Sequence, residues 1–302
     1  MKKYINKTEK ILNENVIYLD LETLGLSKNS PIISASFTKE NQIITYVLTN
    51  LKEEIELMEI IYKETRDKLI VTYNGDRFDL KLLKYKGEKY NINFEFKSLD
   101  YYQVAKKYSY LFESENLKQS TMEKFFGLYR EEDIKGSQVI DCYKNYLETK
   151  DEKYLDLIGK HNSLDVKGLI YLDRIKDYVE DKMSFFYENK KFLIKEINFE
   201  KDILYVEGKT NSNNLYFSNK VYEIKALENN FYLKIFTEKA LYNKNTTCNY
   251  IFVKENFLKS QIESPENILV LKLGKKTLYK NSLGLIKAII ENKIKTQDPY
   301  KL

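Results

Sequence analysis

Four acidic residues stand out because of where they fall in the sequence. Asp20 and Glu22 lie two residues apart at the end of an apolar stretch, and a buried strand that ends in two carboxylates needs a partner for their charge. Asp79 follows a second apolar stretch and a short turn, and Asp165 lies further along in a helical stretch. Carboxylates from separate segments are the ligands that hard divalent cations prefer, so the pattern predicts a metal site.

The predicted cofactor is a pair of divalent cations, Mg²⁺ or Mn²⁺. Two such ions about 3.5–4 Å apart clamp the attacking and leaving oxygens of a phosphodiester during hydrolysis. The chain has one histidine and two distant cysteines, Cys142 and Cys248, which excludes a zinc site built from these residue types. An oxygen-rich ligand set likewise favours Mg²⁺ or Mn²⁺.

The single histidine, His161, lies four residues before Asp165. Residues four apart on a helix share a face, so the two side chains are expected to be neighbours. An unshifted imidazole has a pKa of about 6.5 and is largely neutral at pH 7, which lets it accept a proton from water. His161 is therefore the candidate general base, and the sequence leaves open whether it takes that proton or only lies near the water.

The elements that would position these residues follow an α/β order. Period-2 geometry would point Asp20 and Glu22 to one face of their sheet. The pattern from residue 100 to residue 182 predicts mostly helix. The expected elements are strands Val16–Leu19, Ile32–Phe37 and Ile43–Leu48, helix Glu53–Thr65, strand Leu69–Tyr73, helix Phe78–Tyr85 and a last helix His161–Val179.

The remainder of the chain predicts a smaller, β-rich domain. We therefore expect two domains, residues 1–187 and 188–302, the second ending in a helix at Leu283–Ile294. Its expected strands are Phe192–Phe199, Ile203–Lys209, Leu215–Phe217, Val221–Ala226, Phe231–Phe236 and Tyr250–Val253.

Charge is distributed unevenly between the two parts. Residues 1–185 carry a formal net charge of −2 and residues 186–302 carry +7. A basic, aromatic-rich second domain suits contact with a polyanion, although a basic face is often only solvated. The aromatic residues that could stack on bases, or belong to the core, are Tyr205, Tyr216, Phe217, Tyr222 and Tyr232.

Three motifs together resemble the DEDD superfamily of 3′→5′ exonucleases. They are D-x-E-T at Asp20–Thr23, N-x-x-x-F-D at Asn74–Asp79, and His161-x-x-x-Asp165. With the intervening stretch LKQSTMEKFFGLYREEDIKG, residues 14–180 most resemble the bacterial YprB-like branch. The resemblance implies an RNase H-like mixed sheet flanked by helices.

The resemblance also implies roles for individual residues. Asp20 would bridge both metal ions, Glu22 and Asp165 would complete one metal site, and Asp79 would bind the second ion. The residues expected to contact substrate are Thr23, Leu24, Asn74 and Phe78. The family's histidine usually lies five residues before the aspartate, whereas four is the spacing of members that have tyrosine there.

The predicted function is metal-dependent 3′→5′ exonucleolytic hydrolysis of DNA or RNA, the partner being a nucleic acid with a 3′ end. Two alternatives stay open, a structure-specific endonuclease of the same fold and a non-catalytic nucleic-acid-binding protein. The sequence does not choose between DNA and RNA and indicates no protein partner. The few, distant cysteines and the lack of a membrane-spanning apolar run favour the cytoplasm and exclude a membrane protein.

Overall fold

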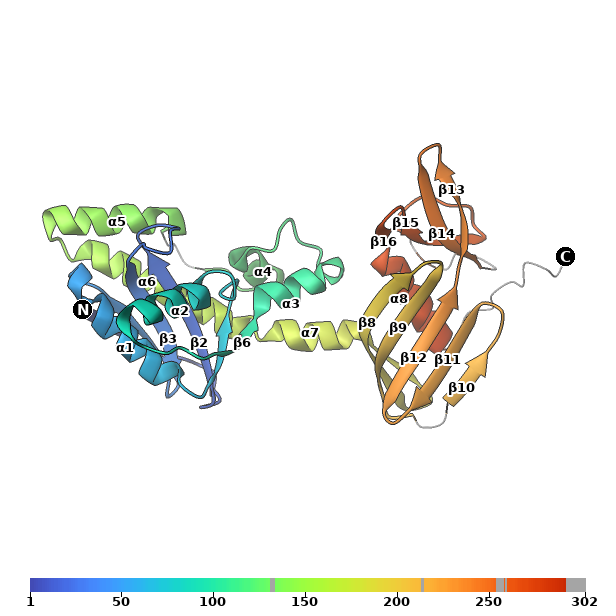
Figure 1. The fold of residues 1–302 in the computed structure, drawn as a ribbon, viewed down its shortest axis with the longest axis horizontal. Coiled ribbons are helices and arrows are strands. Elements are labelled where there is room, and N and C mark those ends of the chain that lie inside the picture. Colours follow the sequence, from blue (N-terminus) through green and yellow to red (C-terminus); the bar gives the residue numbers. More distant parts are fainter. Residues whose placement is uncertain (131–133, 213–214, 254–257, 259, 292–302) are drawn as a thin grey trace. The chain divides into compact units, whose positions relative to one another are not determined.

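The chain divides into two units within one helix. In the computed structural model, which describes residues 1–130, 134–212, 215–253, 258 and 260–291, the units are Met1–Lys176 and Asp177–Leu302 (Figure 1). The division falls inside α7 (Arg174–Met183), ahead of the predicted boundary after residue 187. Of the helices in the described ranges, none is both long and apolar enough to span a membrane.

A six-stranded mixed sheet forms the centre of the first unit. Its order is β1-β4-β3-β2-β5-β6. The neighbours β1, β4, β3 and β2 pair antiparallel, β5 pairs parallel to β2, and β6 pairs parallel to β5. The three strands predicted in the first 50 residues are present as β2, β3 and β4, and a polar edge strand, β1, adds to them. The strands are β1 (Lys2–Lys7), β2 (Val16–Thr23), β3 (Ile32–Lys39), β4 (Gln42–Val47), β5 (Leu69–Thr72) and β6 (Lys97–Asp100).

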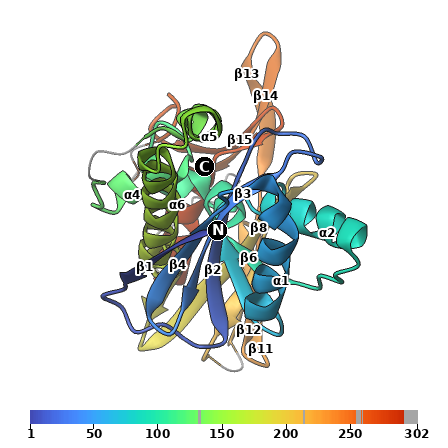
Figure 2. The same cartoon turned by 90° about the vertical axis from the view of Figure 1, so that its left-hand side faces the viewer.

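Helices cover both faces of this sheet (Figure 2). α6 packs on strands β1 to β4 with α5 beside it, while α1 packs on β3 and against α2. The predicted α/β class, a mixed sheet flanked by helices, is confirmed. The helices are α1 (Glu54–Thr65), α2 (Asp79–Tyr90), α3 (Tyr101–Lys107), α4 (Gln119–Phe125), α5 (Gly136–Thr149) and α6 (Lys153–Tyr171), with short 3-10 turns at Leu51–Glu53 and Ser109–Leu111.

A buried ion pair fixes α2, the helix that begins at Asp79. Lys86 Nζ lies 2.6 Å from Glu54 Oε1, and the two side chains are 2% and 9% exposed. Glu54 also accepts hydrogen bonds from the Tyr90 hydroxyl and from the backbone N–H of Ile32. A buried charge pair is stable only when its remaining lone pairs are satisfied, as they are here. The cluster therefore holds α1, α2 and β3 in one arrangement.

The predicted helix His161–Val179 is wrong, because the chain breaks at Leu172 and Asp173. α6 ends at Tyr171 and α7 begins at Arg174. Asp173 is drawn instead into a polar cluster, in which it accepts hydrogen bonds from the hydroxyls of Tyr18 and Tyr101 and pairs with Lys10 and Lys176. A continuous helical periodicity does not reveal such long-range partners.

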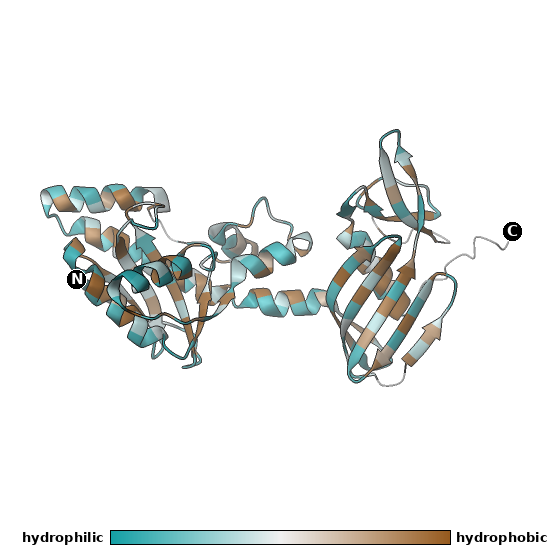
Figure 3. Ribbon diagram, in the orientation of Figure 1, coloured by the Kyte–Doolittle hydropathy of each residue, from teal (hydrophilic) through white to brown (hydrophobic). Residues whose placement is uncertain are grey.

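The described residues of the second unit form two antiparallel sheets, helix α8 (Tyr279–Ile290) and the C-terminal part of α7. Hydrophilic and hydrophobic residues alternate along strands of its larger sheet such as β11 and β12, as expected where one face of a sheet is buried (Figure 3). Helix α8 contacts both β7 and β15. The strands are β7 (Ser184–Tyr187), β8 (Lys190–Glu200), β9 (Ile203–Thr210), β10 (Leu215–Ser218), β11 (Tyr222–Leu227) and β12 (Asn230–Phe236) in one sheet, and β13 (Glu238–Asn243), β14 (Thr246–Phe252), β15 (Ile268–Leu273) and β16 (Lys276–Thr277) in the other.

The β-rich character predicted for this part is confirmed, and the described residues of the second unit contain four strands that were not predicted, namely β7, β13, β15 and β16. β13 is exposed at every residue and so has no alternating pattern, while β16 has two residues. β15 is a continuous apolar run, which periodicity alone does not assign. The last helix begins four residues earlier than predicted, and residues 292–294 of the predicted span lie outside the described residues.

Asp173→Asn should destabilise the first unit by about 2–3 kcal/mol at neutral pH. Burial favours the neutral acid, but hydrogen bonds from Lys10, Tyr101 and Tyr18 outweigh it and hold the pKa of Asp173 at about 2. Since the unfolded pKa is about 3.9, the charge stabilises the fold above about pH 4, and this stabilisation is lost as the pH falls toward 2.

Urea unfolding of the full chain at pH 7 and at pH 3 measures this difference. The gap between wild type and Asp173→Asn should narrow at the lower pH, while the exposed neighbour Asp177→Asn should match wild type at both. A gap of the same size at both values would show that the charge of Asp173 does not stabilise the fold.

Candidate active site

Strand β2 presents Asp20 and Glu22 to α6. The Asn162 side-chain N–H donates to Asp20 Oδ2 over 2.5 Å, and His161 Nε2 lies 3.3 Å from Glu22 Oε1. Asn162 is fully buried and in turn accepts a hydrogen bond from Ser34 of β3. Alternate residues of a strand point to the same face, which is why both carboxylates meet the same helix.

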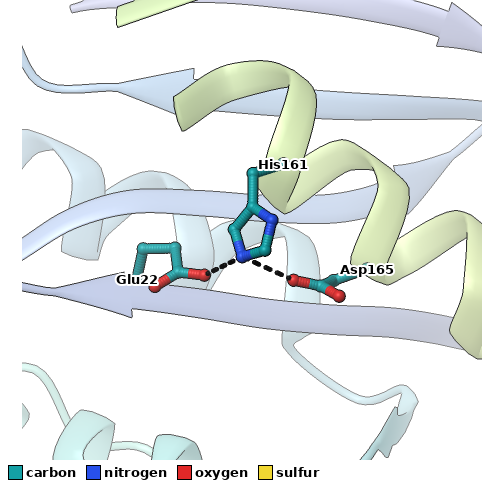
Figure 4. A group of neighbouring side chains, drawn as sticks. All are labelled: Glu22, His161 and Asp165. Carbon is teal, nitrogen blue, oxygen red and sulfur yellow. Dashed lines mark ion pairs between the residues drawn. The ribbon is translucent and has the colours of Figure 1, made fainter. Parts of the chain in front are cut away.

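Helix α6 supplies the third carboxylate, Asp165. His161 Nε2 is 3.3 Å from Asp165 Oδ2, and one turn of helix separates the two residues. Figure 4 shows the imidazole pointing between Glu22 and Asp165, with Nε2 facing both. One ligand atom of each of these three residues lies within 4.8 Å of the others, close enough to hold one cation.

Asp79 is the first residue of α2, directly after a tight turn that contains Asn74. Asn74 adopts a left-handed conformation (φ +67°), which asparagine tolerates better than most residues. The carboxylate of Asp100 holds this turn by accepting the backbone N–H groups of Asn74 (2.7 Å) and Asp76 (3.3 Å), and it also caps α3 at Tyr102. Asp100 therefore supports the site and fixes the start of α2.

The carboxylates raise one another's pKa. The pKa of Asp20 lies well above its ordinary value because of burial, and then because of the charges of Asp165, Asp79 and Glu22. Burial, with Glu22, Asp100 and Asp165 nearby, raises the pKa of Asp79 to about 7, although its backbone N–H lowers it. Bound cations would offset the repulsion between these carboxylates and favour their ionised form. The donor set, oxygen-rich with one imidazole, fits divalent metal ions.

A network of three further residues holds Asp165 from the other side. Arg130 Nη1 lies 2.7 Å from Asp165 Oδ1, and the same guanidinium binds both oxygens of the buried Glu123 at 2.6 Å. Gln119 donates to Glu123 Oε1 and to the backbone carbonyl of Asp165. The bidentate pair of Arg130 with Glu123 fixes the guanidinium in orientation as well as position. Burial raises the pKa of Asp165, and Arg130 and His161 oppose that rise.

A cavity of about 560 Å³ adjoins Glu22 and Asp79. Thr23 and Phe78 line it, and so does the exposed Leu26. Pockets of roughly 300–1,000 Å³ are typical of small-ligand sites, which is room for one nucleotide. The cavity therefore places apolar surface next to the carboxylates.

Leu24 and Asn74, which the resemblance assigns to substrate contact, are not among the residues that line this cavity. Leu24 packs against the core of the first unit, and its backbone N–H donates to the carbonyl of Pro31. The backbone of Asn74 is bound to Asp100, while its buried side-chain oxygen has no hydrogen-bond partner among the described residues.

Comparison with known proteins decides the family. A family model described as the RNase H superfamily matches residues 17–176, more than half of the chain. The chain belongs to the RNase H superfamily. A solved structure, the family B DNA polymerase from the hyperthermophilic archaeon Pyrobaculum calidifontis, is similar at a TM-score of 0.41 and 13% identity, covering 63% of this chain and 33% of the polymerase. No curated protein matches the chain.

As a member of the RNase H superfamily, the chain has the fold of a group of nucleases that act on nucleic acids and usually use divalent metal ions. The acidic cluster of β2 and α6 lies within the matched residues and fits such ions. The first unit is thus an RNase H-like domain, and the second unit lies outside the match.

Sequence reasoning missed the residues that hold the carboxylates in place. Asn162 carries a weak signal, since it lies three residues before Asp165 on the helix face that packs on the sheet. Arg130 lies in a charged turn, of a kind that is usually only solvated, and its partner Glu123 belongs to no recognisable motif. No sequence pattern marks Gly168 either, yet a Cβ there would overlap the Glu123 carboxylate and lie 3.1 Å from Arg130.

Gly168→Ala should therefore destabilise the chain by about 1–3 kcal/mol, the usual cost of overpacking. The added methyl group displaces Glu123, and with it Arg130 and the orientation of Asp165, so nuclease activity should fall by more than stability alone explains. Lys167→Ala, an exposed change one residue away, is the control. Urea unfolding and cleavage rates measure the two effects. If Gly168→Ala has the wild-type free energy of unfolding and the wild-type cleavage rate, Glu123 and Arg130 do not position Asp165.

Proposed function

We propose that this protein is a metal-dependent 3′→5′ exonuclease that hydrolyses phosphodiester bonds of DNA or RNA with two divalent cations. One observation supports it above the others. Carboxylates from β2, α2 and α6 converge beside a cavity of nucleotide size, in the order of the exonuclease motifs. The RNase H superfamily membership of the chain agrees with nuclease chemistry.

The four carboxylates would hold the cations. When bound, two such ions polarise the phosphate and activate the attacking water. Asn162 fixes one oxygen of Asp20 and Arg130 fixes one oxygen of Asp165, so the remaining oxygens are oriented before substrate arrives. A ligand set that is already oriented need not reorganise during the reaction, which lowers the barrier.

The cavity would receive the terminal nucleotide. Phe78 and Leu26 are exposed there and offer apolar surface to a base or sugar. Lys28 also lines the cavity, with its Nζ 4.6 Å from the centroid of the Tyr85 ring. An ammonium group beside an aromatic ring suits contact with a phosphate and a stacked base.

Asp20→Asn should reduce cleavage at least 1,000-fold, since it removes a charge that the cations need. The assay is shortening of a 5′-labelled single strand of DNA or RNA with Mg²⁺ or Mn²⁺, and wild type should give a ladder. Asp67→Asn, an exposed aspartate of the first unit, is the control.

Other outcomes of the same assay contradict the proposal. Internal cuts in a circular single strand would indicate an endonuclease. A wild-type protein that binds both nucleic acids and cleaves neither would indicate a binding protein.

The outer face of the second unit's larger sheet is a proposed contact for the substrate strand. Tyr216, Lys225 and Tyr232 lie side by side on β10, β11 and β12, and all three are exposed. Lys225 Nζ lies 5.4 Å from the Tyr232 ring centroid. Aromatic rings beside lysines on a flat sheet are a platform on which bases stack while phosphates pair with ammonium groups. The net charge of +7 on residues 186–302 agrees with this role.

Lys225→Gln should weaken binding of a single strand and flatten its salt dependence by roughly 0.7 in slope for the lost phosphate contact. Tyr232→Ala should weaken binding by about 1–3 kcal/mol, the stacking energy of one base, with the salt slope unchanged. Lys239→Gln on the exposed strand β13 is the control. Binding titrations at several salt concentrations measure both quantities. If Lys225→Gln keeps the wild-type slope, this face does not bind the strand.

A further inference from the structure

The imidazole of His161 lies among the carboxylates rather than beside them. Its Nε2 atom is 3.3 Å from Glu22 Oε1 and 3.3 Å from Asp165 Oδ2, and the side chain is 9% exposed. Figure 4 shows both contacts leaving the same nitrogen. The four-residue spacing explains the position, because it places the ring directly over Asp165 on one face of α6.

The two equal distances fit three ligand atoms placed around one cation. A charge-assisted N–H···O⁻ bond is shorter, about 2.7–2.9 Å, and is directed at one acceptor. Metal–ligand bonds of about 2.0–2.2 Å put neighbouring ligand atoms roughly 3.0–3.4 Å apart. The separations of 3.3 Å from Nε2 to the two carboxylate oxygens fall in this range.

The surroundings of Asp165 agree with this arrangement. Arg130 takes one oxygen of Asp165, Oδ1, and leaves Oδ2 facing His161. Asp165 would thus give one oxygen to a cation that Glu22 and His161 also face. A nitrogen that binds a cation has no lone pair left to accept a proton, so this position does not suit a general base.

We propose that His161 Nε2 is a direct ligand of one of the two cations, together with Glu22 and Asp165, and that this site therefore takes Mn²⁺ in preference to Mg²⁺. The inference rests on the proposed metal-dependent function. Imidazole is a good ligand for transition metals, whereas Mg²⁺ prefers oxygen ligands throughout. His161 would then set the choice of metal ion.

Pulsed electron paramagnetic resonance on Mn²⁺ bound to the untagged full chain tests the proposal directly. His161 is the chain's one histidine, so an imidazole nitrogen coupled to Mn²⁺ has a single source. Wild type should show ¹⁴N coupling that changes to a ¹⁵N pattern when the protein is grown with ¹⁵N-labelled histidine. This comparison needs no variant and so does not depend on how a variant folds.

Metal titrations of His161→Gln give the second measure, since glutamine offers an oxygen in place of the nitrogen. Mn²⁺ affinity should fall roughly tenfold or more while Mg²⁺ affinity changes much less. Lys167→Gln, an exposed change on the same helix to the same residue type, should keep the wild-type coupling and affinities.

The results separate this inference from the proposed function. If Mn²⁺ binds and Asp20→Asn weakens it, but the histidine coupling is absent and His161→Gln keeps its preference for Mn²⁺, the role of His161 as a ligand is wrong and the metal-dependent function stands. If wild type binds neither ion, or Asp20→Asn changes nothing, the proposed function itself fails.

Discussion

Mutual repulsion among four partly buried carboxylates is the constraint around which the first unit is arranged. The charges of Glu22, Asp79 and Asp165 make Asp20 harder to ionise, and those of Glu22 and Asp165 do the same for Asp79. Residues of other elements hold these carboxylates in place. The supports come from all around the site, from helix α6, from the turn after α4 and from the end of β6. Repulsion between the carboxylates raises the free energy of their ionised form, and divalent cations relieve that repulsion when they bind.

The supports differ in chemistry according to what each carboxylate must do. Asp20 receives a neutral amide N–H from Asn162, which orients the carboxylate without neutralising its charge. Asp165 forms an ion pair with Arg130, and Arg130 is itself held by a second ion pair with Glu123. The negative charge of Asp20 is thus not offset by its support, whereas that of Asp165 is partly offset by Arg130. The two units of the chain then divide the work we propose, with cleavage in the first and strand contact in the second.

The chemistry of the site could be predicted because it depends on spacings that sequence displays. The carboxylate pair of β2 follows the period of a strand, and His161 and Asp165 follow the period of a helix. The α/β order of the first unit followed in the same way. The pairing of Arg130 with Glu123 and Asp165 could not be predicted, because it depends on how α4 packs against α6. The break before α7 was missed for a similar reason, since the partners of Asp173 come from distant parts of the chain.

Anomalous diffraction from crystals soaked in Mn²⁺ tests the central claim most directly, because it locates the cations without relying on turnover. The account predicts two peaks at the meeting point of β2, α2 and α6, one of them in contact with Glu22, His161 and Asp165. Peaks bound only at other acidic residues, with none at Asp20, would contradict it.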